Sequence, residues 1–94
     1  MGGQLQDANG ELYGASWDDY IYRFSSAGAQ LHRLYSGTYD LIDIDISSVT
    51  QQVAVGSRSG LVILTDLQLG TSRSLSAGSM EAFVSFSAPA PASN

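Results

Sequence analysis

The chain has 94 residues, of which 44% are hydrophobic and 14% charged, a composition typical of one small folded domain and not of a multidomain enzyme. Nine acidic against four basic residues give a net charge of −5, which disfavours nucleic acid, and the lack of lysine excludes Schiff-base chemistry, a Walker-type phosphate loop and a polybasic membrane patch. The lack of cysteine excludes disulfides, a thiolate nucleophile and cysteine-ligated metals.

The first ten residues, 1–10, form a polar segment with no basic region and no apolar run, so we expect no secretory signal there. Met1 and Gly2 resemble the start of an acylation signal, but Gln6 stands where serine or threonine is required, which disfavours myristoylation. No stretch approaches the ~18 apolar residues of a membrane span. The sequence therefore predicts a soluble chain; its compartment stays open, with the cytoplasm favoured.

Short apolar and aromatic runs follow, separated by clusters of glycine, serine and aspartate. No window shows the apolar stripe of a helix, so the pattern predicts an all-β fold. The expected strands are 11–16, 20–25, 30–35, 41–47, 52–57, 61–66, 72–77 and 82–87. The last residues, 88–94, are rich in alanine and proline and are expected to form a flexible tail.

The order of small, turn and apolar residues repeats along the chain. Positions 15–22 align with 56–63, and positions 42–47 align with 82–87 at an offset that is shorter by one. The runs 20–22 and 61–64 carry apolar groups on both strand faces, which is typical of sheets covered on both sides. The period of about 41 residues, called the repeat offset below, is that of a four-stranded propeller blade.

The second half of the chain contains an apolar strand ending in serine (44–47), a small-residue strand with a Gly-Ser turn (53–60) and another apolar strand (61–67). In this order it resembles the WD-repeat family of β-propellers, although Thr65 and Phe24 stand at the place of the family's tryptophan. The resemblance covers about residues 11–87 and implies two blades of four antiparallel strands. On the expected strand order the terminal blades are incomplete, because three strands precede the full blade and one follows it.

Two elements invite a catalytic interpretation. His32, the single histidine, lies in an expected outer strand, where a surface role is favoured over that of a general base. Residues 56–60 have the flanking glycines of a nucleophile elbow, but Arg58 stands at the place of the nucleophile, so a turn between strands explains them better. We therefore expect no enzyme activity and no catalytic residue.

Asp43 and Asp45 alternate with isoleucines, so in a strand the two carboxylates project from one face and the isoleucines from the other. Paired carboxylates can bind calcium or act as acid and base. Calcium takes about six to eight oxygens, usually from a glycine-bent loop, and glycosidase pairs need a cleft, neither of which a stiff strand supplies. Asp43 and Asp45 are thus weak metal candidates; hydrogen bonding or solvation near a propeller channel is favoured, and no cofactor is expected.

Trp17, Asp18, Asp19 and Tyr20 place two aromatic and two acidic side chains at a predicted hairpin turn. Such a set can anchor a protein partner or stack on sugar rings, and in a purely structural role Tyr20 enters the core while Trp17 covers the blade edge. Arg58 is the counterpart of Trp17 in the second repeat, so Trp17 of one copy over Arg58 of another would form a cation–π contact. These five residues are the candidate contact site.

A domain of this size buries only about 60–70% of the surface that its unfolded chain exposes, which favours coverage by neighbours. We expect a non-catalytic scaffold that presents surfaces to other proteins, without nucleic acid or membrane partners. Either copies of the chain pair head to tail into a homo-oligomeric ring of six or eight blades, with three chains favoured, or a larger propeller supplies the missing blades. The alternative is a lectin-like propeller that binds glycans through Trp17 and Tyr20.

Overall fold

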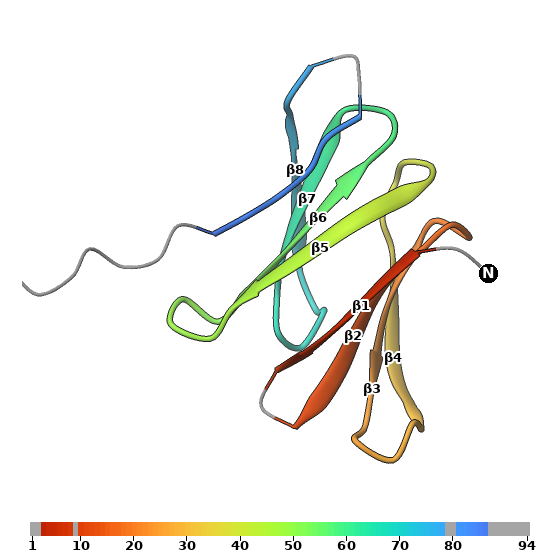
Figure 1. Cartoon of the computed structure of the whole chain (residues 1–94), viewed down its shortest axis with the longest axis vertical. Coiled ribbons are helices and arrows are strands. Elements are labelled where there is room, and N and C mark those ends of the chain that lie inside the picture. The colour runs from red at the N-terminus through yellow and green to blue at the C-terminus, as the bar shows by residue number, and fades with distance from the viewer. Residues whose placement is uncertain (1–2, 9, 79–80, 87–94) are drawn as a thin grey trace, which may run out of the picture.

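The computed structural model describes residues 3–8, 10–78 and 81–86, and within these residues it contains strands and turns but no helix. The strands are β1 (Gly3–Ala8), β2 (Glu11–Ser16), β3 (Tyr20–Phe24), β4 (Gln30–Tyr35), β5 (Leu41–Ser47), β6 (Gln52–Ser57), β7 (Leu61–Asp66) and β8 (Ser72–Ser76). They form two antiparallel sheets, sheet 1 in the order β1-β2-β3-β4 and sheet 2 in the order β5-β6-β7-β8 (Figure 1). The predicted all-β class with four-stranded, blade-like units is confirmed.

Sheet 1 contains a strand that the sequence analysis did not expect. β1 pairs with β2 in continuous register, from Gly3 opposite Ser16 to Ala8 opposite Glu11. The expectation that the first unit lacks its inner strand was therefore wrong. The sequence of β1 is polar, but ladder hydrogen bonds join backbone groups, so β2 can hold a strand that lacks an apolar pattern.

The last expected strand, 82–87, was also wrong for its described part. Residues 81–86 are extended but belong to no ladder, and Ser87, like the tail 88–94, lies outside the described residues. The amide of Ala82 donates to the carbonyl oxygen of Ser57 at 2.9 Å, and the next two bound amides donate to side-chain carboxylates of β5. Carboxylates thus take the place of the strand carbonyls that a ladder would supply.

Corresponding middle strands of the two sheets begin one repeat offset apart. The first residues of β2 and β6 are separated by the repeat offset, and so are those of β3 and β7. The turns between these strands also correspond, because Asp19 and Gly60 occupy equivalent places and have positive φ angles of 75° and 90°. Aspartate is one of the few residues other than glycine that tolerates this region, so both units make the same turn with different residues.

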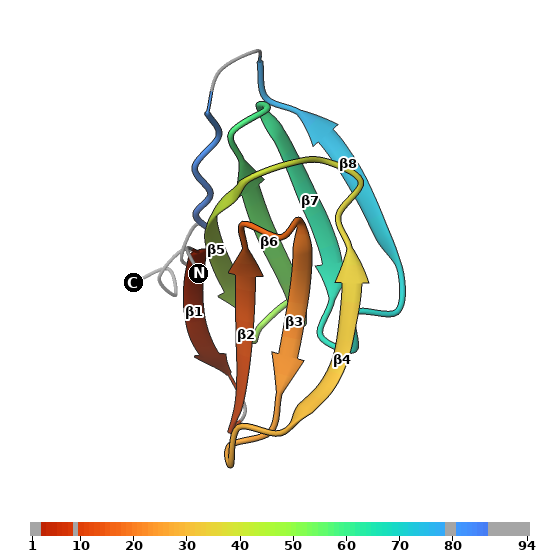
Figure 2. The same ribbon diagram turned by 90° about the vertical axis from the view of Figure 1, so that its right-hand side faces the viewer.

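The core lies between the two sheets, which stack as separate layers with β1 and β5 next to each other (Figures 1 and 2). Residues opposite each other in an antiparallel ladder share a face, so the registers assign each side chain to one side of its sheet. The inner face of sheet 1 carries Tyr13, Ala15, Ile21 and Leu34; the inner face of sheet 2 carries Ile44, Val53, Val55 and Ile63. Leu67 and Leu69, from the β7–β8 turn, complete the core.

The outer faces, which point away from the core, also carry apolar groups. On sheet 1 they are Leu12, Tyr20, Tyr22, Phe24 and Tyr35; on sheet 2 they are Ala54, Gly56, Val62, Leu64 and Leu75. This accounts for the apolar groups on both faces of β3 and β7. No helix long and apolar enough to cross a membrane occurs in the described part of the chain.

Candidate functional site

The predicted contact residues Trp17–Tyr20 form the turn between β2 and β3. Asp18 closes this turn, because its Oδ1 accepts the amide of Tyr20 at 3.1 Å and its Oδ2 accepts the Tyr22 hydroxyl. Asp19 reaches the connection before β5, where its Oδ1 accepts the amide of Asp40 at 2.9 Å. Trp17 remains 54% exposed. The two carboxylates therefore hold the backbone, and of the four residues Trp17 is the one most available to a partner.

Tyr20 lies on the outer face of sheet 1 and not in the core, which corrects the structural alternative of a buried Tyr20. Its ring lies 6.2 Å from that of Tyr22 and 5.5 Å from that of Tyr35, measured between centroids, and Tyr22 stacks on Phe24 at 5.8 Å. The guanidinium of Arg33 lies 4.6 Å from the centroid of Tyr20, a cation–π contact. The aromatic feature of sheet 1 is thus a row of rings across its outer face.

Arg58 lies in the turn between β6 and β7 and binds two acids that the sequence analysis did not single out. Its Nη1 lies 2.7 Å from Glu81 Oε2, and its Nε lies 3.3 Å from Asp40 Oδ2. The Arg58 amide also donates to the carbonyl oxygen of Asp40 at 2.9 Å. Because Asp40 also donates its amide to Asp19, the structure joins Asp19 and Arg58 of the candidate set through Asp40.

The sequence carried a signal for these two acids. Asp40 and Glu81 are separated by the repeat offset. Asp40 directly precedes β5, and Glu81 is the first residue of the extended segment 81–86. Contact between Trp17 and an Arg58 of another copy involves two chains and stays a prediction; within the described residues the guanidinium over an aromatic ring is that of Arg33.

Asp43 and Asp45 hold the segment 81–86 along sheet 2. Asp43 Oδ2 accepts the amide of Val84 at 2.9 Å, and Asp45 Oδ2 accepts the amide of Phe86 at 2.7 Å. The other oxygen of Asp45 accepts Nε2 of Gln6 on β1 at 3.3 Å. No group of three or more potential metal-binding side chains occurs in residues 3–8, 10–78 and 81–86. In this geometry the two carboxylates act as acceptors for an extended backbone.

The pKa of Asp45 makes one of these contacts sensitive to acid. The hydrogen bond from the Phe86 amide, which outweighs desolvation, lowers the pKa of Asp45 below its ordinary value of 3.8. Because the folded-state pKa is lowered, the ionised Asp45 carboxylate stabilises the folded chain above pH 3.8. This stabilisation is lost as the pH falls through the folded-state pKa. We expect the amide chemical shift of Phe86 to titrate with a midpoint below 3.8. Asp45→Asn is the control, because its amide side chain does not titrate; a shift of Phe86 that is unchanged in acid would contradict the contact.

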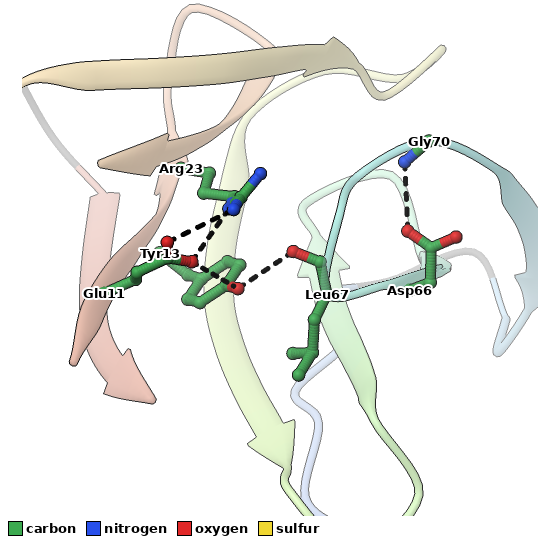
Figure 3. Close-up of polar contacts among 6 residues, drawn as sticks. All are labelled: Glu11, Tyr13, Arg23, Asp66, Leu67 and Gly70. Atoms are coloured by element: carbon green, nitrogen blue, oxygen red, sulfur yellow. Dashed lines mark hydrogen bonds and ion pairs between the residues drawn. The ribbon is translucent and has the colours of Figure 1, made fainter. Parts of the chain in front are cut away.

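A polar contact inside the sheet interface ties sheet 1 to the β7–β8 turn (Figure 3). Tyr13 is 1% exposed, and its hydroxyl donates to the carbonyl oxygen of Leu67 at 2.8 Å. Burial, followed by the negative charge of Glu11, raises the pKa of Tyr13, so this donor stays protonated at neutral pH. Beside it, Arg23 Nε lies 2.8 Å from Glu11 Oε1, and this hydrogen bond lowers the pKa of Glu11. The group fixes how the two sheets meet.

The two elements that invited a catalytic interpretation lie in different sheets. His32 is exposed on β4. Residues 56–60 join strand to strand, whereas a nucleophile elbow joins a strand to a helix. Ser57 Oγ donates to the carbonyl oxygen of Leu61 at 2.9 Å and lies 2.7 Å from Ser59 Oγ, so the serines close the turn.

A polar hollow of about 330 Å³ opens on sheet 2 between the β5–β6 turn and the adjoining ends of β7 and β8. Thr50, Asp66 and Arg73 are among its lining residues. Asp66 is committed to the β7–β8 turn, because its Oδ1 accepts the amide of Gly70 at 3.0 Å, which lowers the pKa of Asp66 (Figure 3). The acid in this hollow thus has a structural partner.

No protein-family model, no curated protein and no solved structure matches the chain.

Proposed function

We propose that this chain is a non-catalytic β-propeller unit that serves as a scaffold for protein contacts and is completed by further blades. The observation that carries the proposal is the apolar character of both outer sheet faces. Tyr35 is 58% exposed on one of them and Leu75 is 47% exposed on the other. Contiguous exposed apolar groups of this kind mark contact surfaces for protein.

The acids of the candidate site support a scaffold over an enzyme. Asp18, Asp19, Asp43 and Asp45 each accept at least one backbone amide in the described residues. A general base must keep its acceptor oxygen within reach of a substrate proton. Carboxylates that bind the chain's own amides instead maintain turns and the contact with 81–86.

The experiment is a tandem polypeptide of three copies, compared with the single copy in urea at low chain concentration. If the units stack as blades, each junction covers two outer faces, and the tandem chain unfolds at a higher urea concentration. Tyr22→Glu in every copy should remove this gain, whereas Val49→Glu should not, because Val49 is 73% exposed in the β5–β6 turn, away from the faces. Equal midpoints for tandem and single chains would contradict the proposal.

Glycan binding is the result that would replace the proposed scaffold function with the lectin-like one. Trp17 is exposed, but its counterpart in the second unit is Arg58, so the chain does not repeat an aromatic sugar platform. We expect no binding on a glycan array. Micromolar binding that is lost in Trp17→Ala would favour the lectin-like function instead.

A further inference from the structure

Residues on the outer face of sheet 1 are equivalent, at the repeat offset, to residues that are deeply buried in sheet 2. At the repeat offset, Leu12 corresponds to Val53 and Tyr22 to Ile63. Val53 is 0% and Ile63 2% exposed, because they pack against sheet 1. Leu12 and Tyr22 remain half-buried. Sheet 1 thus presents a face of the kind that packs in sheet 2, but no sheet formed by residues 3–8, 10–78 and 81–86 covers it.

The outer face of sheet 2 shows the converse relation. Val62 corresponds to Ile21 and Leu75 to Leu34, and both Ile21 and Leu34 pack against the core. Ile21 is 0% exposed, whereas Leu75 is 47% exposed. Sheet 2 therefore offers, at β7 and β8, the kind of face through which sheet 1 packs inside the chain. Over β5 and β6 the segment 81–86 covers this face.

The volumes of the two outer faces are complementary. In the interface within the chain, the large Tyr13 of sheet 1 meets β-branched residues of sheet 2. On the outer faces the sizes are reversed, because sheet 2 has Ala54 at the place of Tyr13, and sheet 1 has Tyr22 and Phe24 at the places of Ile63 and Thr65. Two facing layers pack closely when the summed volume of their side chains fills the space between the sheets. Large residues on one face opposite small residues on the other give the same summed volume as the interface within the chain.

We infer that the two outer faces bind each other in different copies of this chain, sheet 1 of one copy on sheet 2 of the next. The contact is heterologous, since it joins two different surfaces, and it generates a ring when the rotation closes. Three copies give six blades, within the range of about four to eight blades for propellers. This inference rests on the proposed function of the chain as a propeller unit, and the partner that it names is a second copy of the chain.

The segment 81–86 extends the series of inner strands toward that partner. In the sequence alignment Ala82 was placed opposite Ile42, but at the full repeat offset Ala82 corresponds to Leu41, the first residue of β5. Ala82 and Leu41 are both buried, at 5% and 0% exposure. The contact with sheet 2 is close, because a Cβ atom at Gly56 would lie 2.1 Å from the carbonyl oxygen of Ala82. The segment thus lies over β5 and β6 on the outer face of sheet 2, where a third unit would begin.

β1 of the incoming copy would occupy this same place. We therefore expect 81–86 to pair with β2 of that copy and β1 to leave its own sheet. In the ring, the amides of Phe83 and Ser85 should become protected from hydrogen exchange, and those amides of β1 that donate to β2 should lose protection, relative to a monomeric variant. The reverse pattern would overturn this strand exchange.

Light scattering on the purified chain tests the ring directly. The expected mass is three times the 9.9 kDa of one chain. Tyr22→Glu on the outer face of sheet 1, or Val62→Glu on that of sheet 2, should each lower the mass to that of a single folded chain. Val49→Glu is the matched control and should leave the mass of the ring unchanged.

A mixture of the two face variants separates head-to-tail packing from other dimers. A Tyr22→Glu chain retains an intact sheet 2 face, and a Val62→Glu chain retains an intact sheet 1 face. Mixed, they should form one-to-one dimers and nothing larger, because one good contact remains per pair. Dimers in the mixture would also show that both variants fold. Tyr35→Glu with Leu75→Glu repeats the test at more exposed positions of the two faces, should the first pair fail to fold.

A stable, folded single-chain mass for the unmodified protein would overturn the inference, as would mixed variants that stay monomeric. Open-ended polymers would overturn the closed ring. The tandem polypeptide distinguishes these failures from failure of the proposed function: a tandem chain that gains stability while free copies stay apart keeps the blade-like unit and rejects self-assembly. In that case the blades that complete the propeller belong to another polypeptide.

Discussion

Tyr13→Ala is expected to lower the free energy of unfolding by about 3–5 kcal/mol, the range for truncating a large aromatic residue in a core. The ring is 1% exposed between the two sheets, so its removal opens a cavity at their interface. The hydroxyl is lost as well, together with its 2.8 Å hydrogen bond to the Leu67 carbonyl. Urea unfolding followed by circular dichroism, at one fixed chain concentration, measures the change.

Tyr13→Phe separates the hydroxyl from the ring. Its expected cost is about 1–3 kcal/mol, because the buried Leu67 carbonyl loses its donor while the packing is retained. A Tyr13→Phe variant as unstable as Tyr13→Ala would show that the hydrogen bond outweighs the ring. Equal stability of Tyr13→Phe and the unmodified protein would show that the Leu67 carbonyl finds another donor.

The sequence was sufficient for the strands whose ends are marked by turn residues. The expected bounds of β2 and β6 agree with the structure, as do those of β4, β5 and β7. Gly28 and Gly60, with φ angles of 90°, supply turns that glycine makes easily, and this composition is visible without coordinates. Local chemistry thus predicts local structure.

The elements at the ends of the described chain depend on partners that are not local. β1 is a strand because β2 pairs with it, and 81–86 stays outside the ladders because carboxylates of β5 bind its amides. Neither fact is visible in the hydrophobic pattern, since that pattern reports side-chain burial and not backbone pairing. Both misassignments come from this difference.

The positions of single residues in the candidate site were predicted from the sequence, but the contacts between them were not, for the same reason. Trp17 is exposed at its predicted turn, but Asp19 and Arg58 meet only through Asp40. The contact of Tyr13 with Leu67 joins residues that are 54 positions apart. Turn residues can be recognised one by one in the sequence. A hydrogen-bond network between the two units can be predicted only when the stacking of the two sheets is known.

The second large effect is expected for Ile44→Ala, with about 2–5 kcal/mol of lost stability from transfer and cavity terms. Ile44 is 6% exposed and belongs to the core between the sheets. The neighbouring substitution Asp43→Ala should cost about 0.5–1.5 kcal/mol, because it removes one half-exposed acceptor for the Val84 amide on the opposite face. Both substitutions shorten a side chain of the same strand, so they differ mainly in the face that they affect. In urea, the midpoint for Ile44→Ala should lie well below that for Asp43→Ala. Equal midpoints, or the opposite order, would mean that the core-facing side of β5 has been assigned incorrectly, and with it the outer face of sheet 2 that the ring requires.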